Sequence, residues 1–309
     1  HTELLQKTLY NEMRGRIKED DTTVPYKFGN YMYYTRTEEN LQYDIYCRKL
    51  GNSSGAEEIT LNMNDMAKKH DYIDLSAYKI SPNEKLLALT IDTSGAELHK
   101  LIIKDIKTGE ILDDYLSNLD GSVEWANDNK TLFYTVLDKA HRSYQLWRHE
   151  LGDEQSDDLL VLQEDDDRFS VGLHRTKSGE FLKMDLESQI TTEVYLLDRN
   201  DPFGEWKLVQ PREQGVEYYV YHHGNYLYQI TNKDAINFKM IRTTLKGGKE
   251  DEIIPNRDKT TLDDVSMFKN HMAVLERIDG NLEIRLFNFE DDSWYNIEMN
   301  EDIYSVTFE

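Results

Sequence analysis

The segments YMYYT (Tyr31–Thr35) and YDIYC (Tyr43–Cys47) decide the fold, because both are short, aromatic-rich and alternating, and a polar turn separates them. This pattern predicts an antiparallel pair of strands. Similar pairs recur through nearly the whole chain. The later pairs are Leu86–Ile91 with Leu98–Ile103, Thr131–Val136 with Tyr144–Trp147, Phe181–Met184 with Glu193–Leu197, Tyr226–Ile230 with Phe238–Ile241, and Met272–Glu276 with Leu282–Phe287.

These pairs define six units between Pro25 and Asn300, or about 46 residues per unit, which is close to the repeat length of four-stranded propeller blades. Turn sequences such as Ser81–Lys85 and Ala126–Lys130 precede the second strand of their units at matching places, which favours a propeller over a sandwich. We therefore predict an all-β fold, a β-propeller of six four-stranded blades. Residues Asp302–Glu309 resemble the first strand of a seventh blade.

The N-terminal segment has a different period. Leu5, Leu9, Met13 and Ile17 recur at every fourth position, which predicts a helix over residues 3–18. A second short helix is predicted from Asn62 to Lys69. We accordingly divide the chain into an N-terminal helical segment, residues 1–20, and a propeller domain, residues 21–309, that is truncated.

The two ends of the chain suggest a fragment. The sequence starts at His1 instead of Met, and its first residues have neither the basic region nor the apolar region of a signal peptide. No run of about 18 apolar residues predicts a membrane span. The last predicted strand has no partner, and such a free edge favours a homodimer through unpaired strand edges.

Composition excludes several kinds of partner. The 309 residues include 59 acidic and 36 basic ones, for a net charge of −23, which argues against nucleic acid and anionic membranes. We interpret the acidic runs as solvated turns, and Cys47, the single cysteine, as a small core residue in a reducing, cytoplasmic protein. The acidic runs are Glu19–Asp21, Asp153–Glu154 with Asp157–Asp158, Glu164–Asp167 and Glu290–Asp292.

No segment predicts chemistry. Gly51–Gly55 matches G-x-S-x-G around Ser53, but a strand, a polar turn and another strand surround it, where a nucleophile elbow needs a helix after the serine. We interpret it as a hairpin loop. His222 and His223 precede the Gly224-Asn225 turn and are interpreted as surface turn residues. The histidines lack zinc-ligand spacing and nucleotide motifs are absent, so we predict no catalytic residue, no metal and no cofactor.

Several strings together resemble the oligopeptidase B (protease II) branch of the prolyl oligopeptidase family of serine peptidases. The resemblance covers essentially the whole chain. The strings are Met13–Tyr26, Tyr33–Glu39, Tyr43–Arg48, Leu61–Ala67 with His70–Tyr72, Leu132–Val136, Asp166–Gly172, Val274–Arg277 and Tyr304–Val306.

The resemblance implies a seven-bladed propeller that covers an α/β-hydrolase domain and admits short peptides, which this branch cleaves after Arg or Lys. The Ser-Asp-His triad of such enzymes lies in the hydrolase domain, so none of it carries over to this chain. The implied partners are that domain and short basic peptides. Arg142, in the polar segment Asp138–Ser143, is the one candidate interdomain contact, and a solvated hairpin residue is the alternative. A stand-alone propeller that binds other proteins is the alternative function.

Overall fold

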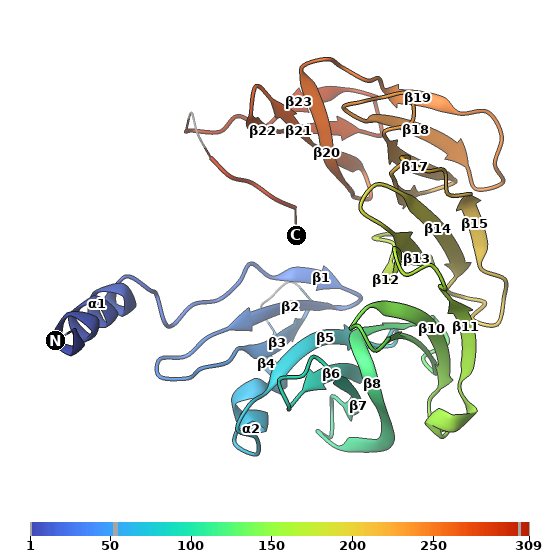
Figure 1. The fold of residues 1–309 in the computed structure, drawn as a ribbon. Helices are drawn as coiled ribbons and strands as arrows, with labels where there is room; N and C mark the ends of the chain where they lie inside the picture. The colour runs from blue at the N-terminus through green and yellow to red at the C-terminus, as the bar shows by residue number, and fades with distance from the viewer. Residues whose placement is uncertain (1, 52–54, 302–303, 309) are drawn as a thin grey trace. The chain divides into compact units, whose positions relative to one another are not determined.

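The computed structural model describes residues 2–51, 55–301 and 304–308. The chain forms two compact units, residues 1–117 and residues 118–309. Figure 1 labels their helices and strands in chain order. No helix in the described ranges is long and apolar enough to cross a membrane.

The first unit begins with helix α1 (Glu3–Gly15), shorter at its C-terminal end than the predicted helix. Gly15 lowers helix propensity there, and the N–H groups of Arg16 and Ile17 bond to carbonyls three residues back, which tightens the last turn. Helix α2 (Met63–Ala67) confirms the second predicted helix, and the Asn62 side chain caps it by accepting the Asn64 N–H at 3.0 Å. The strands of this unit are β1 (Tyr26–Phe28), β2 (Tyr31–Arg36), β3 (Ile45–Leu50), β4 (Glu57–Asn62), β5 (Asp74–Ile80), β6 (Leu86–Asp92), β7 (His99–Asp105) and the first part of β8 (Ile111–Trp125).

The second unit continues from β8, which is long enough to end one antiparallel sheet and begin the next. Each later sheet has four strands in sequence order, so neighbouring strands are joined by hairpins. Its strands are β9 (Thr131–Leu137), β10 (Ser143–Glu150), β11 (Leu159–Gln163), β12 (Ser170–Arg175), β13 (Phe181–Glu187), β14 (Thr192–Asp198), β15 (Lys207–Gln210), β16 (Tyr218–His223), β17 (Tyr226–Thr231), β18 (Lys239–Thr244), β19 (Asp251–Ile254), β20 (Thr260–Met267), β21 (His271–Ile278), β22 (Asn281–Asn288) and β23 (Trp294–Asn296).

The predicted strand pairs are all confirmed as antiparallel neighbours, in four four-stranded sheets and in one seven-stranded sheet that runs from β5 to β11 through the long strand β8. The turns repeat as well as the strands. Glu84, Asn129 and Gly179 occupy the same place before the second strand, and each has a positive φ, of 61°, 62° and 75°. A turn that needs a left-handed residue at the same position three times along the chain is a structural repeat.

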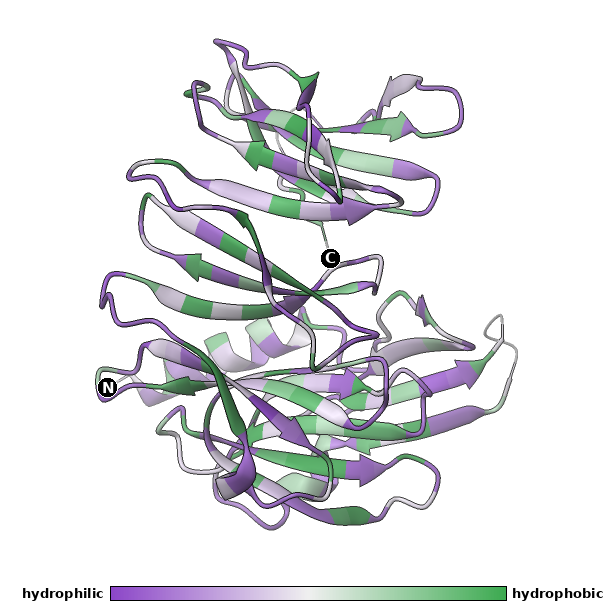
Figure 2. Ribbon diagram, turned by 90° about the vertical axis from the view of Figure 1, so that its right-hand side faces the viewer, coloured by the Kyte–Doolittle hydropathy of each residue, from purple (hydrophilic) through white to green (hydrophobic). Residues whose placement is uncertain are grey.

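Consecutive sheets pack face to face through apolar side chains, and Figure 2 shows hydrophobic and hydrophilic residues alternating along many strands. In the first unit Leu61 and Met63 pack with Leu87 and Leu89. The second unit repeats the arrangement between β9–β11 and β12–β15, between β12–β15 and β16–β19, and between β16–β19 and β20–β23. The fold is therefore an all-β propeller of four-stranded blades preceded by a short helix.

The C-terminal segment packs on the last sheet. Asp302, Ile303 and Glu309 lie outside the described residues, and the structure assigns no strand to residues 304–308. Val306 and Phe308 contact the cluster of Ala273, Leu275 and Ile284. The described part of the predicted first strand of a seventh blade therefore packs on the last sheet but forms no β-ladder with it.

Buried Arg199 connects two sheets of the second unit. Its guanidinium donates to the carbonyl oxygen of Trp125 at 2.9 and 3.0 Å and to that of Gly179 at 2.7 Å. Burial lowers the pKa of Arg199 to about 10, so the group remains a cation at neutral pH. The side chain thereby satisfies carbonyl groups that packing has removed from water.

Replacing Arg199 should destabilise the fold. In Arg199→Met the carbonyls of Trp125 and Gly179 lose their donor, and we expect the free energy of unfolding to fall by about 2–4 kcal/mol. Exposed Arg168, which pairs with Asp166 at 2.6 Å across a turn, is the matched control. Arg168→Met should change the free energy of unfolding by less than about 0.5 kcal/mol. Urea unfolding followed by tryptophan fluorescence measures both, and equal losses would contradict this role for Arg199.

Candidate functional site

The first strands of three consecutive sheets in the second unit, β12, β16 and β20, converge on one cavity. Its volume is about 210 Å³. Because each strand belongs to a different sheet, the cavity exists only where the sheets pack together. The lining residues are His174, Arg175, Thr176, Lys177, Lys183, Val220, Tyr221, His222, Val265, Ser266 and Met267.

The cavity wall is basic although the chain is acidic. Three lysine or arginine residues and two histidines line it, and no carboxylate does. Lys183 is neutralised by Asp185, whose Oδ1 lies 3.2 Å from its Nζ. Lys177 differs, because its Nζ donates to the hydroxyl of Ser266 at 2.7 Å and lies 4.2 Å from the centre of the Phe268 ring. Burial lowers the pKa of Lys177, and the negative charge of Asp264 opposes that shift.

His222 is the second unusual group of the cavity. The side chain is buried, its Nδ1 lies 2.8 Å from the Ser178 hydroxyl, and its ring packs edge-on against Phe181. Its Nε2 has no hydrogen-bond partner within the described ranges. A buried unpaired ring nitrogen costs about 1–3 kcal/mol unless a water or ligand occupies the site.

The surface-turn prediction is wrong for His222, which is the fifth residue of β16 and only 2% exposed. Strand alternation turns it inward, and the turn begins only after His223. His223 stacks on Phe289 with ring centres 3.9 Å apart. No sequence pattern pointed to Lys177, which follows β12 in the turn before β13.

Arg142, the candidate from the sequence, is bound within its own unit. Its guanidinium donates to the Asp138 carboxylate at 3.0 Å and to the carbonyl oxygens of Glu164, Asp166 and Phe169 at 2.6 to 3.3 Å. The side chain is 15% exposed, so the alternative of a solvated hairpin residue is wrong. Arg142 holds the loop before β12 against the β9–β10 hairpin. A contact to a further domain stays a prediction.

The G-x-S-x-G match lies in a hairpin. Asn52, Ser53 and Ser54 are outside the described residues, but β3 and β4 on either side pair antiparallel, with Arg48 opposite Glu58 and Lys49 opposite Glu57. The flanking strands are paired as expected, and the interpretation of Gly51–Gly55 as a hairpin loop stays a prediction. Cys47, in the same hairpin, is 1% exposed and burial raises its pKa to about 11, as expected of a core thiol.

Two acidic residues interpreted as solvated are buried instead. Asp158 accepts from the Tyr134 hydroxyl at 2.7 Å and lies 2.6 Å from His149 Nδ1, and both side chains of that His–Asp pair are at most 1% exposed. Glu164 pairs with Arg212 at 2.5 Å. The His149–Asp158 pair is sealed from solvent, so it serves the core and does not contact a substrate.

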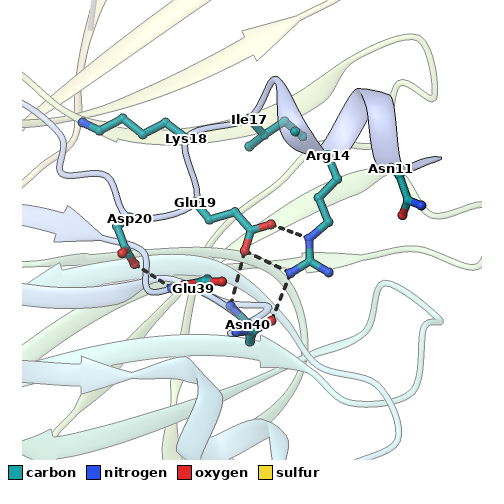
Figure 3. Close-up of a pocket in the computed structure, with 9 residues that line it drawn as sticks. Asn11, Arg14, Ile17, Lys18, Glu19, Asp20, Glu39 and Asn40 are labelled. Atoms are coloured by element: carbon teal, nitrogen blue, oxygen red, sulfur yellow. Dashed lines mark hydrogen bonds and ion pairs between the residues drawn. The ribbon is translucent and has the colours of Figure 1, made fainter. Parts of the chain in front are cut away.

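A larger hollow of about 700 Å³ lies beside α1 in the first unit (Figure 3). Arg14 binds the Glu19 carboxylate and donates to Asn40 Oδ1 at 3.1 Å, while Asp20 accepts the Glu39 N–H at 2.7 Å. These bonds attach the end of the helix to the loop after β2. The hollow is open to solvent and its Arg14 and Glu19 charges are paired, so we assign it a structural role.

Comparison with known families decides the identity of this fold. The family model described as "Prolyl oligopeptidase, N-terminal beta-propeller domain" matches residues 1–308. The chain belongs to the prolyl oligopeptidase family. The resemblance inferred from its sequence is confirmed.

The chain is similar to oligopeptidase B over almost its full length. Protease 2 of Moraxella lacunata is 30% identical over an alignment of 306 residues, which covers 96% of this chain and 44% of that protein. The structure of oligopeptidase B from Leishmania major superposes with a TM-score of 0.91 at 28% identity, covering 97% of this chain and 44% of that one. Oligopeptidase B from Trypanosoma brucei, with covalently bound antipain in a closed form, gives 0.89 at 29% identity with the same coverage. The chain therefore spans less than half the length of these relatives.

The environment of His222 predicts a pH dependence of stability. Burial holds the pKa of folded His222 below its usual value. Glu180 and the Gly224 backbone oppose the shift, and His223 adds to it. The unfolded chain then binds a proton near pH 6.5 that the folded chain resists, so the free energy of unfolding falls as pH drops below about 6.5.

His222→Gln should remove this component, which is at most about 1.4 kcal/mol at pH 5.5. The free energy of unfolding of both proteins is measured in urea at pH 7.5 and 5.5. The contributions of all other titrating groups cancel when the losses of the two proteins are compared. The wild-type protein should lose more stability than the variant. Equal losses would mean that folded His222 titrates normally.

Proposed function

We propose that this chain is the non-catalytic propeller cap of an oligopeptidase B-like serine endopeptidase, which gates the access of short peptides to a hydrolase domain outside the chain. The observation that carries the proposal is the family match over residues 1–308, together with relatives of which the chain covers 44%. Cleavage after Arg or Lys is part of the same proposal.

The exposed face of α1 supports a partner domain. Leu5, Leu9 and Met13 form the apolar stripe of the helix and are 45 to 60% exposed, and no residue of α1 is buried. An amphipathic helix with an uncovered apolar stripe is typical of a surface that binds a partner. We assign the hydrolase domain to this face.

The propeller fold supports gating. In a propeller the blades surround a narrow central channel, which passes an extended peptide but excludes a folded protein. The chain's net charge of −23 adds a field that concentrates basic peptides. We extend the proposal to a cytoplasmic location, from the single unpaired cysteine, and to a homodimer through free strand edges.

The first test separates a cap from an enzyme. The 309-residue chain should not hydrolyse a chromogenic Arg peptide, whereas a chimera carrying it in place of the matching part of Moraxella Protease 2 should do so. The chimera should leave a folded, Lys-rich small protein intact.

Turnover by the chain alone that Ser53→Ala abolishes would overturn the proposal, and so would a chimera that degrades the folded protein. The hydrolase part of the Moraxella protein can also be tested without any propeller. If that fragment is active and still cleaves only short peptides, gating by this domain is rejected.

Electrostatic attraction predicts a salt dependence. In the same chimera, kcat/KM for a peptide with extra Lys residues should fall several-fold between low salt and about 0.3 M, because ions screen the acidic field. The control is a peptide of equal length with Gln in place of the extra Lys, and its kcat/KM should change little. If both peptides respond alike, the acidic field does not attract the substrate.

A further inference from the structure

We propose that the free edge of β11 binds an extended apolar segment of another molecule, with basic residues at both ends, which adds a strand to the sheet. The inference goes beyond the gating proposed above and does not depend on it. It rests on an unpaired backbone edge, on exposed leucines and on acidic residues that flank the strand.

The outer edge of β11 is open. The strand is the last of its sheet and pairs only with β10, which lies beside it in Figure 1. Alternate residues of β11 therefore direct their backbone N–H and C=O groups away from β10, and no described residue bonds to them there. Such an edge is a template for one more strand.

The side chains distinguish β11 from the other outer strands. Its sequence, Leu-Leu-Val-Leu-Gln, contains no charge, and Leu159 and Leu160 are 55% and 46% exposed. Charged side chains protect many natural sheet edges, and β4, β15 and β19 each contain one or two. The remaining outer strand, β23, has only three residues. The edge of β11 is therefore the least protected of these.

A bulge limits how much of this edge a partner can use. Val161 has no partner in the register between β10 and β11, and β4, β15 and β19 contain a one-residue bulge in the same way. The bulge therefore does not set β11 apart from the other edges. It interrupts the straight part of the strand, so backbone pairing extends over a few residues and other contacts must add to the affinity.

Acidic residues lie at both ends of the edge and can supply those contacts. Asp153, Glu154 and Asp157 precede β11, and Asp165 and Asp167 follow it. All five are exposed, and none forms an ion pair among the described residues. The other three acids of these two runs already have a histidine or arginine partner. The unpaired carboxylates leave a negative charge on each side of the leucines.

These charges decide between possible partners. Antiparallel pairing of β11 with a second copy about Val161 would place Asp157 opposite Asp165, and parallel pairing would place each acid beside its own copy. Self-pairing is therefore disfavoured, and the homodimer proposed above would use a different edge. A segment with apolar residues between lysines or arginines instead covers Leu159 and Leu160 and brings a cation to each acidic end.

Binding is tested on the 309-residue chain with fluorescein-labelled peptides. The probe is Lys-Lys-Val-Leu-Val-Lys-Lys with blocked ends. Three matched peptides have Glu in place of Lys, Gly-Ser-Gly in place of the apolar centre, or N-methyl groups on the three central amides. Each change should weaken binding at least fivefold, as measured by fluorescence anisotropy. Hydrogen exchange measured by mass spectrometry should show the probe slowing exchange in the segment that contains β11.

One variant tests the edge itself. Leu159→Lys combined with Leu160→Lys introduces the charge that other edges have, and it should weaken binding of the probe at least tenfold. The control is Leu208→Lys on β15, at a leucine that is 41% exposed, which should leave binding unchanged. Both sites are exposed, so both proteins should fold.

A second variant tests the flanking charge. Asp157→Asn combined with Asp167→Asn should weaken binding of the probe at least threefold. Glu250→Gln combined with Glu252→Gln removes the same net charge at exposed acids in and beside β19, and it should leave binding unchanged. Equal effects of the two double variants would mean that only the overall charge attracts the peptide, and would reject the site.

Other outcomes would also overturn the proposal. These are an absence of binding, equal binding of the N-methylated peptide, and protection from exchange outside β11. A dimer of the chain alone that Leu159→Lys with Leu160→Lys dissociates, seen by analytical ultracentrifugation, would show that a second copy occupies the edge. None of these measurements uses peptidase activity, so an inactive chimera with an intact β11 site would reject the proposed function alone.

Discussion

A four-stranded twisted sheet with two apolar faces cannot be stable alone, and every other property of this chain depends on that constraint. Each sheet must have both faces covered, and here the next sheet along the chain covers one of them. Burial of aliphatic and aromatic side chains at about 25 cal/mol per Å² supplies the driving force. Because each repeat depends on its neighbours, the fold is a series of packed sheets.

Packing sheets together also buries polar backbone, and long cations satisfy much of it. Arg199 donates to the carbonyls of Trp125 and Gly179 in the second unit. In the first unit Arg48 donates to the carbonyl of Glu84, which belongs to the next sheet. These side chains suit the task because their apolar stems pack while their charged ends reach a carbonyl. Lys177 extends between sheets in the same way to Ser266, but it meets a cavity and not a carbonyl.

The same architecture accounts for the contrast between the surface and the cavity. Acidic residues predominate in the chain as a whole, whereas the walls between β12, β16 and β20 contain cations and histidines.

Local sequence determined the strands, the turns and the family. The apolar and aromatic composition of Tyr31–Thr35 or Leu86–Ile91 is a local property, and so is the left-handed residue at Glu84, Asn129 or Gly179 before a second strand. Both are visible in a short window. Only the tertiary structure decided which polar residues are buried and which partners they bind. His222 meets Ser178 across 44 residues and Lys177 meets Ser266 across 89, while Glu164 pairs with Arg212 across 48. Such pairs depend on how one sheet packs on the next, and burial, pairing and the cavity arise from that packing and not from the spacing of residues along the chain.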